Sequence, residues 1–267
     1  MDTATSRRAW VDQIMGMPIS VHLRGGDLDG STTAKAVARV FADLRRVDEL
    51  FSTYRADSQI TRFNRGELAV NDLDPMVRAV ISLCEQARVR TDGYFDAYLP
   101  APGGGRHFDP SGLVKGWAAE RASLYLRRMS TVSFYLNAGG DIIVGGPVGA
   151  EPWRVGVEDP TDSTKLVDVI AVGSGAVATS GSAHRGLHIV DPHSGVPAME
   201  IQSATVVGES LTWADVYATA AVACGREAAN RMAQVAGYEA LLVCSDGRLL
   251  ATPGWPSAQR RPIGRPA

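Results

Sequence analysis

The chain has 267 residues and a formal net charge of −2, and hydrophobic residues make up 45% of it against 21% for charged residues. These values are ordinary for globular proteins, so they exclude the disordered and fibrous classes. The near-neutral balance also argues against nucleic acid as a partner, because nucleic-acid binding favours a strongly basic face.

The first half of the chain alternates between strand and helix patterns. Residues 13–24 alternate apolar and polar side chains near their end, which predicts a strand. Apolar residues recur at helical spacing over 31–51, which predicts an amphipathic helix. A polar loop is expected over 52–66, followed by a second helix over 74–90 that ends before an Asp-Gly turn.

The second half of the chain is richer in strand patterns. In chain order we expect a flexible loop over 101–112, a helix over 114–129, two short strands around a glycine-rich turn over 133–146, strands over 153–160, 166–180 and 187–192, a strand over 203–208 that leads into a helix over 212–236, and a hairpin over 239–253.

Strands therefore come in pairs and clusters and do not alternate strictly with helices. That order favours an α+β fold with a largely antiparallel sheet over a doubly wound fold. We expect one compact unit over residues 10–253, preceded by a flexible N-terminal segment over 1–9. The basic, Pro-rich segment 254–267 is expected to be disordered.

The cysteines and the N-terminal residues indicate in which cellular compartment the protein is expected. Cys84, Cys224 and Cys244 are far apart and form no CxxC pair, which indicates reduced thiols in a reducing compartment. No run of 18 apolar residues exists, so we expect no transmembrane helix. Arg7 and Arg8 are followed by no apolar segment and no cysteine for lipid attachment. We therefore expect neither a secretory signal nor a membrane anchor, and a cytoplasmic location.

An acid and a hydroxyl lie four residues apart in the nearly apolar stretch 211–225. Asp215 and Thr219 fall on one helix face, where both offer oxygen to a hard cation such as Mg²⁺. The alternative is structural: Asp215 lies in the first helical turn, stabilised by the helix dipole, and Thr219 bonds back to its own helix. The pair by itself favours the structural alternative.

A turn with Pro110 and Gly112 enters a predicted helix near Lys115 and Gly116. Backbone N–H groups at a helix start, together with a lysine, form an anion site. An ordinary turn with a solvated lysine is equally compatible with these residues. The spacing is not that of a P-loop.

Two further motifs have open alternatives. Residues 137–141, NAGGD, allow the backbone to approach a ligand closely or form a tight β-turn. His188 ends a predicted strand, where it either acts as a general base near neutral pH or bonds to the turn that follows. His184 and His193 lie nearby, but the spacing is not that of a zinc site.

The order of these motifs resembles the ApbE family, the magnesium-dependent FAD:protein FMN transferases. The resemblance runs from residue 15 to about residue 225 and implies an α+β, ApbE-like fold. It rests on nine blocks in family order: MG (15–16), FSTYRADSQITRFN (51–64), GYFDA (93–97), DPSGLVKG (109–116), NAGGD (137–141), VGVEDP (155–160), ATSG (178–181), HIVDPHSG (188–195) and ADVYAT (214–219).

The resemblance implies a role for each matched position. Asp215 and Thr219 would bind Mg²⁺ through their side chains, and Gly112 and Ala218 through their backbone carbonyls. His188 matches a histidine implicated in flavin transfer. The residues that would line the FAD site are Met15, Tyr54, Tyr94, Phe95, Asp96, Asp109, Lys115 and Ile189.

The implied reaction joins FMN from FAD to a threonine or serine hydroxyl of an acceptor flavoprotein and releases AMP. With water as the nucleophile, the same site would be a Mg²⁺-dependent FAD pyrophosphatase, and a non-catalytic FAD-binding protein is a third alternative. The chain departs from the family pattern in the short segment 181–187. Residues 174–179 are faintly similar to the family's target motif but lack its hydroxyl, so self-flavinylation is not expected.

Overall fold

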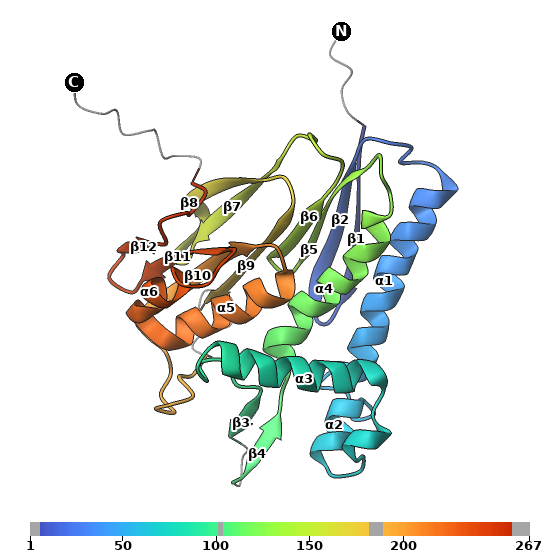
Figure 1. Cartoon of the computed structure of the whole chain (residues 1–267). Coiled ribbons are helices and arrows are strands. Elements are labelled where there is room, and N and C mark those ends of the chain that lie inside the picture. Colours follow the sequence, from blue (N-terminus) through green and yellow to red (C-terminus); the bar gives the residue numbers. More distant parts are fainter. Residues whose placement is uncertain (1–5, 101–103, 182–188, 258–267) are drawn as a thin grey trace, which may run out of the picture.

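Eight strands pair into one sheet that forms the frame of the fold (Figure 1). The computed structural model describes residues 6–100, 104–181 and 189–257. In spatial order the strands are β1 (Arg7–Ile14), β2 (Met17–Arg24), β5 (Ser133–Ala138), β6 (Asp141–Gly145), β9 (Gly175–Gly181), β10 (Ile201–Gly208), β11 (Tyr238–Cys244) and β12 (Leu249–Ala251). All neighbouring strands are antiparallel, which confirms the predicted α+β class and its largely antiparallel sheet.

Two separate hairpins and six α-helices complete the described fold. The hairpins are β3 (Tyr98–Pro100) with β4 (Arg106–Phe108), and β7 (Trp153–Asp159) with β8 (Asp162–Val172). The helices are α1 (Ser31–Phe51), α2 (Gln59–Asn64), α3 (Pro75–Arg90), α4 (Ser111–Arg127), α5 (Leu211–Cys224) and α6 (Ala228–Met232), with single 3₁₀ turns at Val70–Asp72 and Gly225–Glu227. Within the described residues, no helix combines the length and apolar character needed to cross a membrane.

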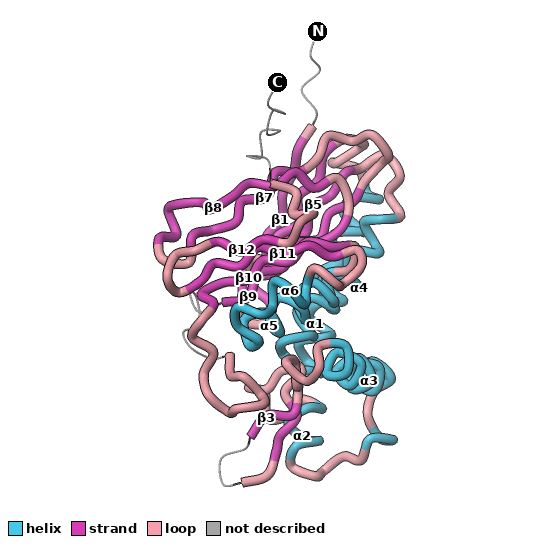
Figure 2. Tube along the Cα trace, turned by 60° about the vertical axis from the view of Figure 1, so that its left-hand side comes forward, coloured by secondary structure: helices cyan, strands magenta, loops and turns pink. Residues whose placement is uncertain are grey.

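The main sheet is covered on both faces. Figure 2 shows the helices gathered on one side of it. The β7–β8 hairpin packs on the other side. Strand β6 is buried along its whole length for this reason. Its Ile143 joins the apolar core under the helices, whereas Ile142 and Val144 pack with Val155 and Ile170 of the hairpin. The continuous apolar run at 142–144 is explained because its side chains pack alternately against the helix layer and against the β7–β8 hairpin.

The long helices form where the sequence predicts them. Helix α1 matches the predicted range 31–51 and buries its apolar face. Helix α3 begins directly after Asp74, whose carboxylate accepts a hydrogen bond from the Met76 N–H, and Pro75 occupies the first turn. Helix α4 begins at Ser111, three residues before its predicted start.

The single strand predicted over 13–24 is wrong, because this region is the second half of a hairpin. Met15 and Gly16 both have positive φ, 56° and 71°, as a two-residue type I′ turn requires. The turn joins β1 to β2, and β1 pairs from Arg7 onward. The expected flexibility of residues 1–9 is therefore wrong from Arg7 on, and residues 1–5 lie outside the described residues.

Two predicted loops contain short regular elements. The polar stretch 52–66 holds helix α2, which is capped by Ser58 through a hydrogen bond from the Thr61 N–H. The glycine-rich stretch 101–112 holds β4, which pairs with β3, and the start of α4. The expected strand over 187–192 is reduced to one bridge between Val190 and Pro197, with residues 187 and 188 outside the described part of the chain.

The helix predicted over 212–236 ends early. Gly225 has a φ of 77°, a conformation that favours glycine and stops α5 at Cys224. A 3₁₀ turn and the short helix α6 follow. The apolar pattern continues past the break, which explains why the sequence alone suggested one long helix.

The start of the C-terminal segment packs into the fold. Trp255 is 4% exposed and its Nε1–H donates to Asp168 Oδ2 at 2.8 Å, while the Ser257 hydroxyl donates to Asp168 Oδ1 at 3.0 Å. The expected disorder of segment 254–267 is therefore wrong for residues 254–257. Residues 258–267 lie outside the described residues.

Replacing Trp255 with alanine should lower the free energy of unfolding by about 3–5 kcal/mol, because a buried aromatic ring is lost. Trp255→Phe keeps an aromatic ring but removes the donor to Asp168, and should cost about 1–3 kcal/mol. Urea denaturation measures both changes. Leu249→Ala, at a half-exposed position, is the control and should change stability by about 0.5 kcal/mol. A Trp255→Ala protein as stable as this control would contradict the packing.

Candidate functional site

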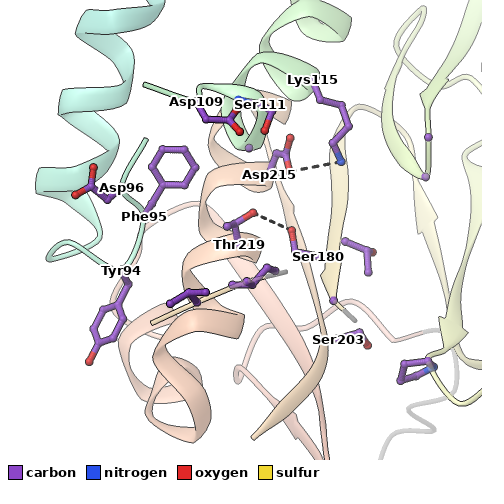
Figure 3. A pocket seen from close by; sticks show the side chains of 18 of the residues that line it. Tyr94, Phe95, Asp96, Asp109, Ser111, Lys115, Ser180, Ser203, Asp215 and Thr219 are labelled. Carbon is purple, nitrogen blue, oxygen red and sulfur yellow. Dashed lines mark hydrogen bonds and ion pairs between the residues drawn. The ribbon is translucent and has the colours of Figure 1, made fainter. Parts of the chain in front are cut away.

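A cavity of about 860 Å³ lies at the first turns of α4 and α5. Its walls come from segments far apart in the sequence: the linker after α3, the β5–β6 turn, the tip of the β7–β8 hairpin and the end of β9. Figure 3 shows the side chains of Lys115 and Asp215 directed at each other, with Thr219 and Ser180 beside them. The sequence-predicted helix pair is thus part of a cavity wall.

Helices α4 and α5 pack so closely at Gly116 that the position has no room for a side chain. A Cβ atom there would lie 2.8 Å from the Leu211 carbonyl oxygen and 3.0 Å from Asp215 Cβ. The Gly116 N–H donates instead to Asp215 Oδ2 at 3.2 Å. The helix crossing therefore sets the acid of α5 against the backbone of α4.

Glu120, one turn further along α4, fixes the beginning of α5. Its Oε2 accepts hydrogen bonds from the Ser210 hydroxyl at 2.8 Å, the Thr212 N–H at 2.9 Å and the Thr212 hydroxyl at 2.6 Å. A carboxylate at a helix N-terminus satisfies N–H donors and is favoured by the helix dipole. Gly116 and Glu120 together set the position of α5, and with it that of its acid and hydroxyl.

Two buried carboxylates share one lysine at the cavity wall. Asp141 and Asp215 are 0% and 1% exposed. Lys115 Nζ pairs closely with Asp141 Oδ2 and lies 3.6 Å from Asp215 Oδ1. Burial, followed by the charge of Asp141, raises the pKa of Asp215, while Lys115 and the Gly116 N–H act in the opposite direction. With both carboxylates ionised, these three side chains carry one negative charge in excess.

The Thr219 hydroxyl meets β9 one turn beyond Asp215. Thr219 Oγ1 lies 2.9 Å from Ser180 Oγ, and the neighbouring Thr179 N–H donates to Asp141 Oδ1 at 3.1 Å. Strand β9 therefore aligns the hydroxyl pair with the buried carboxylates. The donor set is all oxygen and, with both carboxylates ionised, carries an excess negative charge, which fits a hard cation such as Mg²⁺.

The described part of the chain holds no group of three or more His, Cys, Asp or Glu side chains arranged for a metal ion. A cation site at Asp215 would therefore depend on hydroxyl and carbonyl oxygens, or on a ligand's phosphate, to complete its coordination. Carboxylates are nevertheless abundant nearby. Among the described lining residues they are Asp96, Asp109, Glu158, Asp159 and Asp215, and Lys115 is the one Lys or Arg.

The cavity brings together most of the residues predicted from the sequence. Those that line it are Tyr94, Phe95, Asp96, Asp109, Gly112, Lys115, Ile189, Asp215 and Thr219. Met15, Tyr54 and Ala218 are not among the described lining residues: Met15 forms the β1–β2 turn, Tyr54 is 97% exposed, and Ala218 is buried in α5. His188 lies outside the described residues, as does the neighbouring segment 182–187.

Sequence reasoning missed three residues that organise this site. Asp141 was part of the NAGGD motif, but only its glycines had been given a role. Ser180 lies in the ATSG block, but neither it nor Glu120 was assigned a role from the sequence. A charged residue next to a paired glycine turn was the available signal for Asp141. Glu120 and Ser180 act through partners 92 and 39 residues away, which a local pattern does not reveal.

The family model described as the ApbE family matches residues 15–100 and 98–242. These ranges contain the helix crossing, the buried carboxylates and the described cavity walls. The chain belongs to the ApbE family.

Curated ApbE relatives carry one activity in their names. The FAD:protein FMN transferase of Vibrio cholerae is 26% identical over 273 residues, covering 82% of this chain and 81% of that protein. The FAD:protein FMN transferase of Rhodobacter capsulatus is 33% identical over 155 residues, which cover 54% of this chain and 29% of that protein.

Solved ApbE structures share the fold. The ApbE protein of Thermotoga maritima superposes with a TM-score of 0.79 at 22% identity, covering 93% of this chain and 97% of that one. The apo flavinyl transferase ApbE of Pseudomonas stutzeri gives a TM-score of 0.79 at 23% identity, covering 95% and 97%.

In this ApbE chain, Gly116→Ala tests the helix crossing. Alanine stabilises a helix by about 1 kcal/mol relative to glycine, but here its Cβ overlaps α5, and overpacking costs about 1–3 kcal/mol. We expect a net loss of stability in thermal or urea unfolding. Gly173→Ala, whose Cβ would meet nothing within 4 Å, is the control and should be neutral. A Gly116→Ala protein more stable than the wild type would contradict the close contact.

Proposed function

We propose that this chain transfers FMN from FAD to a threonine or serine hydroxyl of an acceptor protein, with release of AMP and dependence on Mg²⁺. The observation that carries the proposal is the buried Asp141–Lys115–Asp215 group beside the Thr219 hydroxyl in a cavity of ligand size. The names of the ApbE relatives support the same reaction.

An anionic diphosphate in this cavity needs a cation. The lining carboxylates repel phosphate. Among the described lining residues Lys115 is the one Lys or Arg, because Arg106, which pairs with Asp96, lies outside the lining. Bound Mg²⁺ would supply charge neutralisation at the phosphates. Asp215 and Thr219 would hold it through side-chain oxygens, and Gly112 and Ala218 through carbonyl oxygens.

Aromatic side chains offer surfaces for the rings of the dinucleotide. A Cβ atom on Gly112 would lie 3.2 Å from Phe95 Cε2, so the Phe95 ring packs on the first turn of α4. The Tyr94 ring lies edge to face with His193, their centroids 4.6 Å apart. Both aromatic residues line the cavity. We propose that they pack against the flavin or adenine while Lys115 faces the phosphates.

The proposed step exchanges one phosphoester bond for another. The acceptor hydroxyl oxygen bonds to the phosphorus on the FMN side, the pyrophosphate P–O bond breaks, and AMP leaves with the bridging oxygen. His188, assigned from its sequence motif, takes the hydroxyl proton. Such a displacement depends on positioning and electrostatic stabilisation, which a rigid helix crossing with fixed charges provides.

The direct test incubates the purified chain with FAD, Mg²⁺ and an acceptor protein bearing the family's target motif. AMP release and an acceptor heavier by one FMN phosphoester are expected. AMP and free FMN with an unmodified acceptor, across several acceptors, would indicate a pyrophosphatase. Tight FAD binding without AMP would indicate a binding protein.

Asp215→Asn should remove the metal dependence without unfolding the protein, because the amide keeps an oxygen for the Gly116 N–H but loses the charge. We expect the rise in melting temperature on Mg²⁺ addition to disappear, with apparent Mg²⁺ affinity reduced by at least about 100-fold. Differential scanning fluorimetry measures this shift. Asp57→Asn, a surface change, is the matched control. An unchanged Mg²⁺ response in Asp215→Asn would remove Asp215 from the metal site.

His188→Ala should slow FMN transfer by about 10²–10⁴-fold, the usual contribution of a general base, and leave FAD affinity near the wild-type value. Single-turnover transfer and FAD titration by fluorescence separate the two effects. His193→Ala provides a comparison within the same motif and should retain most of the transfer rate. Equal losses of rate and FAD affinity in His188→Ala would make His188 a binding residue.

A further inference from the structure

In the proposed site Asp141 is neither a metal ligand nor a flavin contact, yet it is the carboxylate nearest to Lys115. It is fully buried, and its Oδ2 contacts Lys115 Nζ more closely than Asp215 Oδ1 does at 3.6 Å. Lys115 therefore contacts two carboxylates, which also interact with each other, and it lies nearer to the one on the sheet. The unequal distances of Lys115 from the two carboxylates matter because Asp215 is the carboxylate that would bind the metal.

The sheet holds Asp141 rigidly. Gly139 and Gly140 turn the chain with positive φ, the Gly140 N–H donates to Asn137 Oδ1 at 2.8 Å, and Asp141 then begins β6. The Thr179 N–H of the adjacent strand β9 donates to Asp141 Oδ1 at 3.1 Å. One oxygen of the carboxylate is thus fixed by the backbone, which directs the other oxygen at Lys115. A charged group on a sheet is a precise anchor for a flexible lysine.

An ammonium group and a divalent cation compete for the same carboxylate. If Lys115 paired mainly with Asp215, that ion pair would have to break before Asp215 could bind a metal, and the electrostatic gain would be reduced accordingly. A second carboxylate that engages Lys115 removes the competition. With both carboxylates ionised, Asp141, Lys115 and Asp215 together also carry one excess negative charge, which a bound cation would offset.

We propose that Asp141 is a positioning residue that holds the Lys115 ammonium off the Asp215 carboxylate and so keeps Asp215 available to a divalent cation. The inference rests on the proposed function for the location of the metal site. It predicts that a residue which is not itself a metal ligand controls metal affinity, and that it does so through Lys115.

The test titrates Mg²⁺ alone into four proteins without FAD, by calorimetry and by thermal shift: the wild type, Asp141→Asn, Lys115→Met and the double variant Asp141→Asn/Lys115→Met. Asp141→Asn should weaken Mg²⁺ binding by at least about tenfold, the usual effect of a residue that supports a metal ligand, because Lys115 then pairs with Asp215. The double variant should return to near the wild-type affinity, because the competing ammonium is gone. Asp168→Asn, titrated in the same way as a control, changes a buried carboxylate on β8 and should leave Mg²⁺ affinity unchanged.

A purely structural role for Asp141 predicts a different pattern: Asp141→Asn and the double variant would lose Mg²⁺ binding alike. Any one of three results would overturn the inference: this equal loss, unchanged Mg²⁺ binding in Asp141→Asn, or a wild type that binds no Mg²⁺. If Asp141→Asn does not fold, as judged by its metal-free melting curve, Lys115→Met decides, since it should bind Mg²⁺ at least as tightly as the wild type. A wild type that shows the predicted Mg²⁺ pattern but transfers no FMN would refute the proposed function alone.

Discussion

The close contact of α4 and α5 at Gly116 is the constraint on which the rest of the site depends. Because this position has no side chain, the backbone N–H of α4 reaches the Asp215 carboxylate, and Lys115 is brought beside the same group. Glu120 then secures the start of α5 from the next turn of α4. The site is therefore built on two closely packed helices, and the sheet contributes Asp141 from β6 and Ser180 from β9.

Helix α5 is nearly apolar, yet it can bury Asp215 because neighbouring groups interact with the charge of this carboxylate. An isolated carboxylate at 1% exposure would be costly. Here a backbone N–H and a lysine stabilise the ionised form, while burial and the second carboxylate oppose it. The Asp215 carboxylate is therefore fixed in position, but the single positive charge of Lys115 does not neutralise two ionised carboxylates. A polar group in that condition, at the wall of a large cavity, suits a role in binding a cationic partner more than a role in stability.

The sequence predicted elements that depend on local patterns. Helix α1 follows from its amphipathic spacing, helix α3 was expected up to the Asp-Gly turn that ends it, and the β11–β12 hairpin was expected over 239–253. The same patterns failed where a distant contact or one backbone angle decides. Strand β1 is defined by its pairing with β2, α5 stops at a single positive-φ glycine, and Trp255 is buried by a partner 87 residues away. The site divides likewise: the α4 and α5 residues were found from motifs, whereas the link from Asp141 to Lys115 needed the fold.

The proposed function depends on a divalent cation bound at Asp215 and Thr219, beside the crossing of α4 and α5. The most direct measurement is an anomalous difference map from crystals grown with FAD and Mn²⁺ in place of Mg²⁺. We expect a peak about 2.1 Å from an Asp215 carboxylate oxygen and from Thr219 Oγ1, with Lys115 still paired to Asp141. A cavity that holds FAD with no peak at Asp215, or a peak bound by other residues, would contradict this expectation.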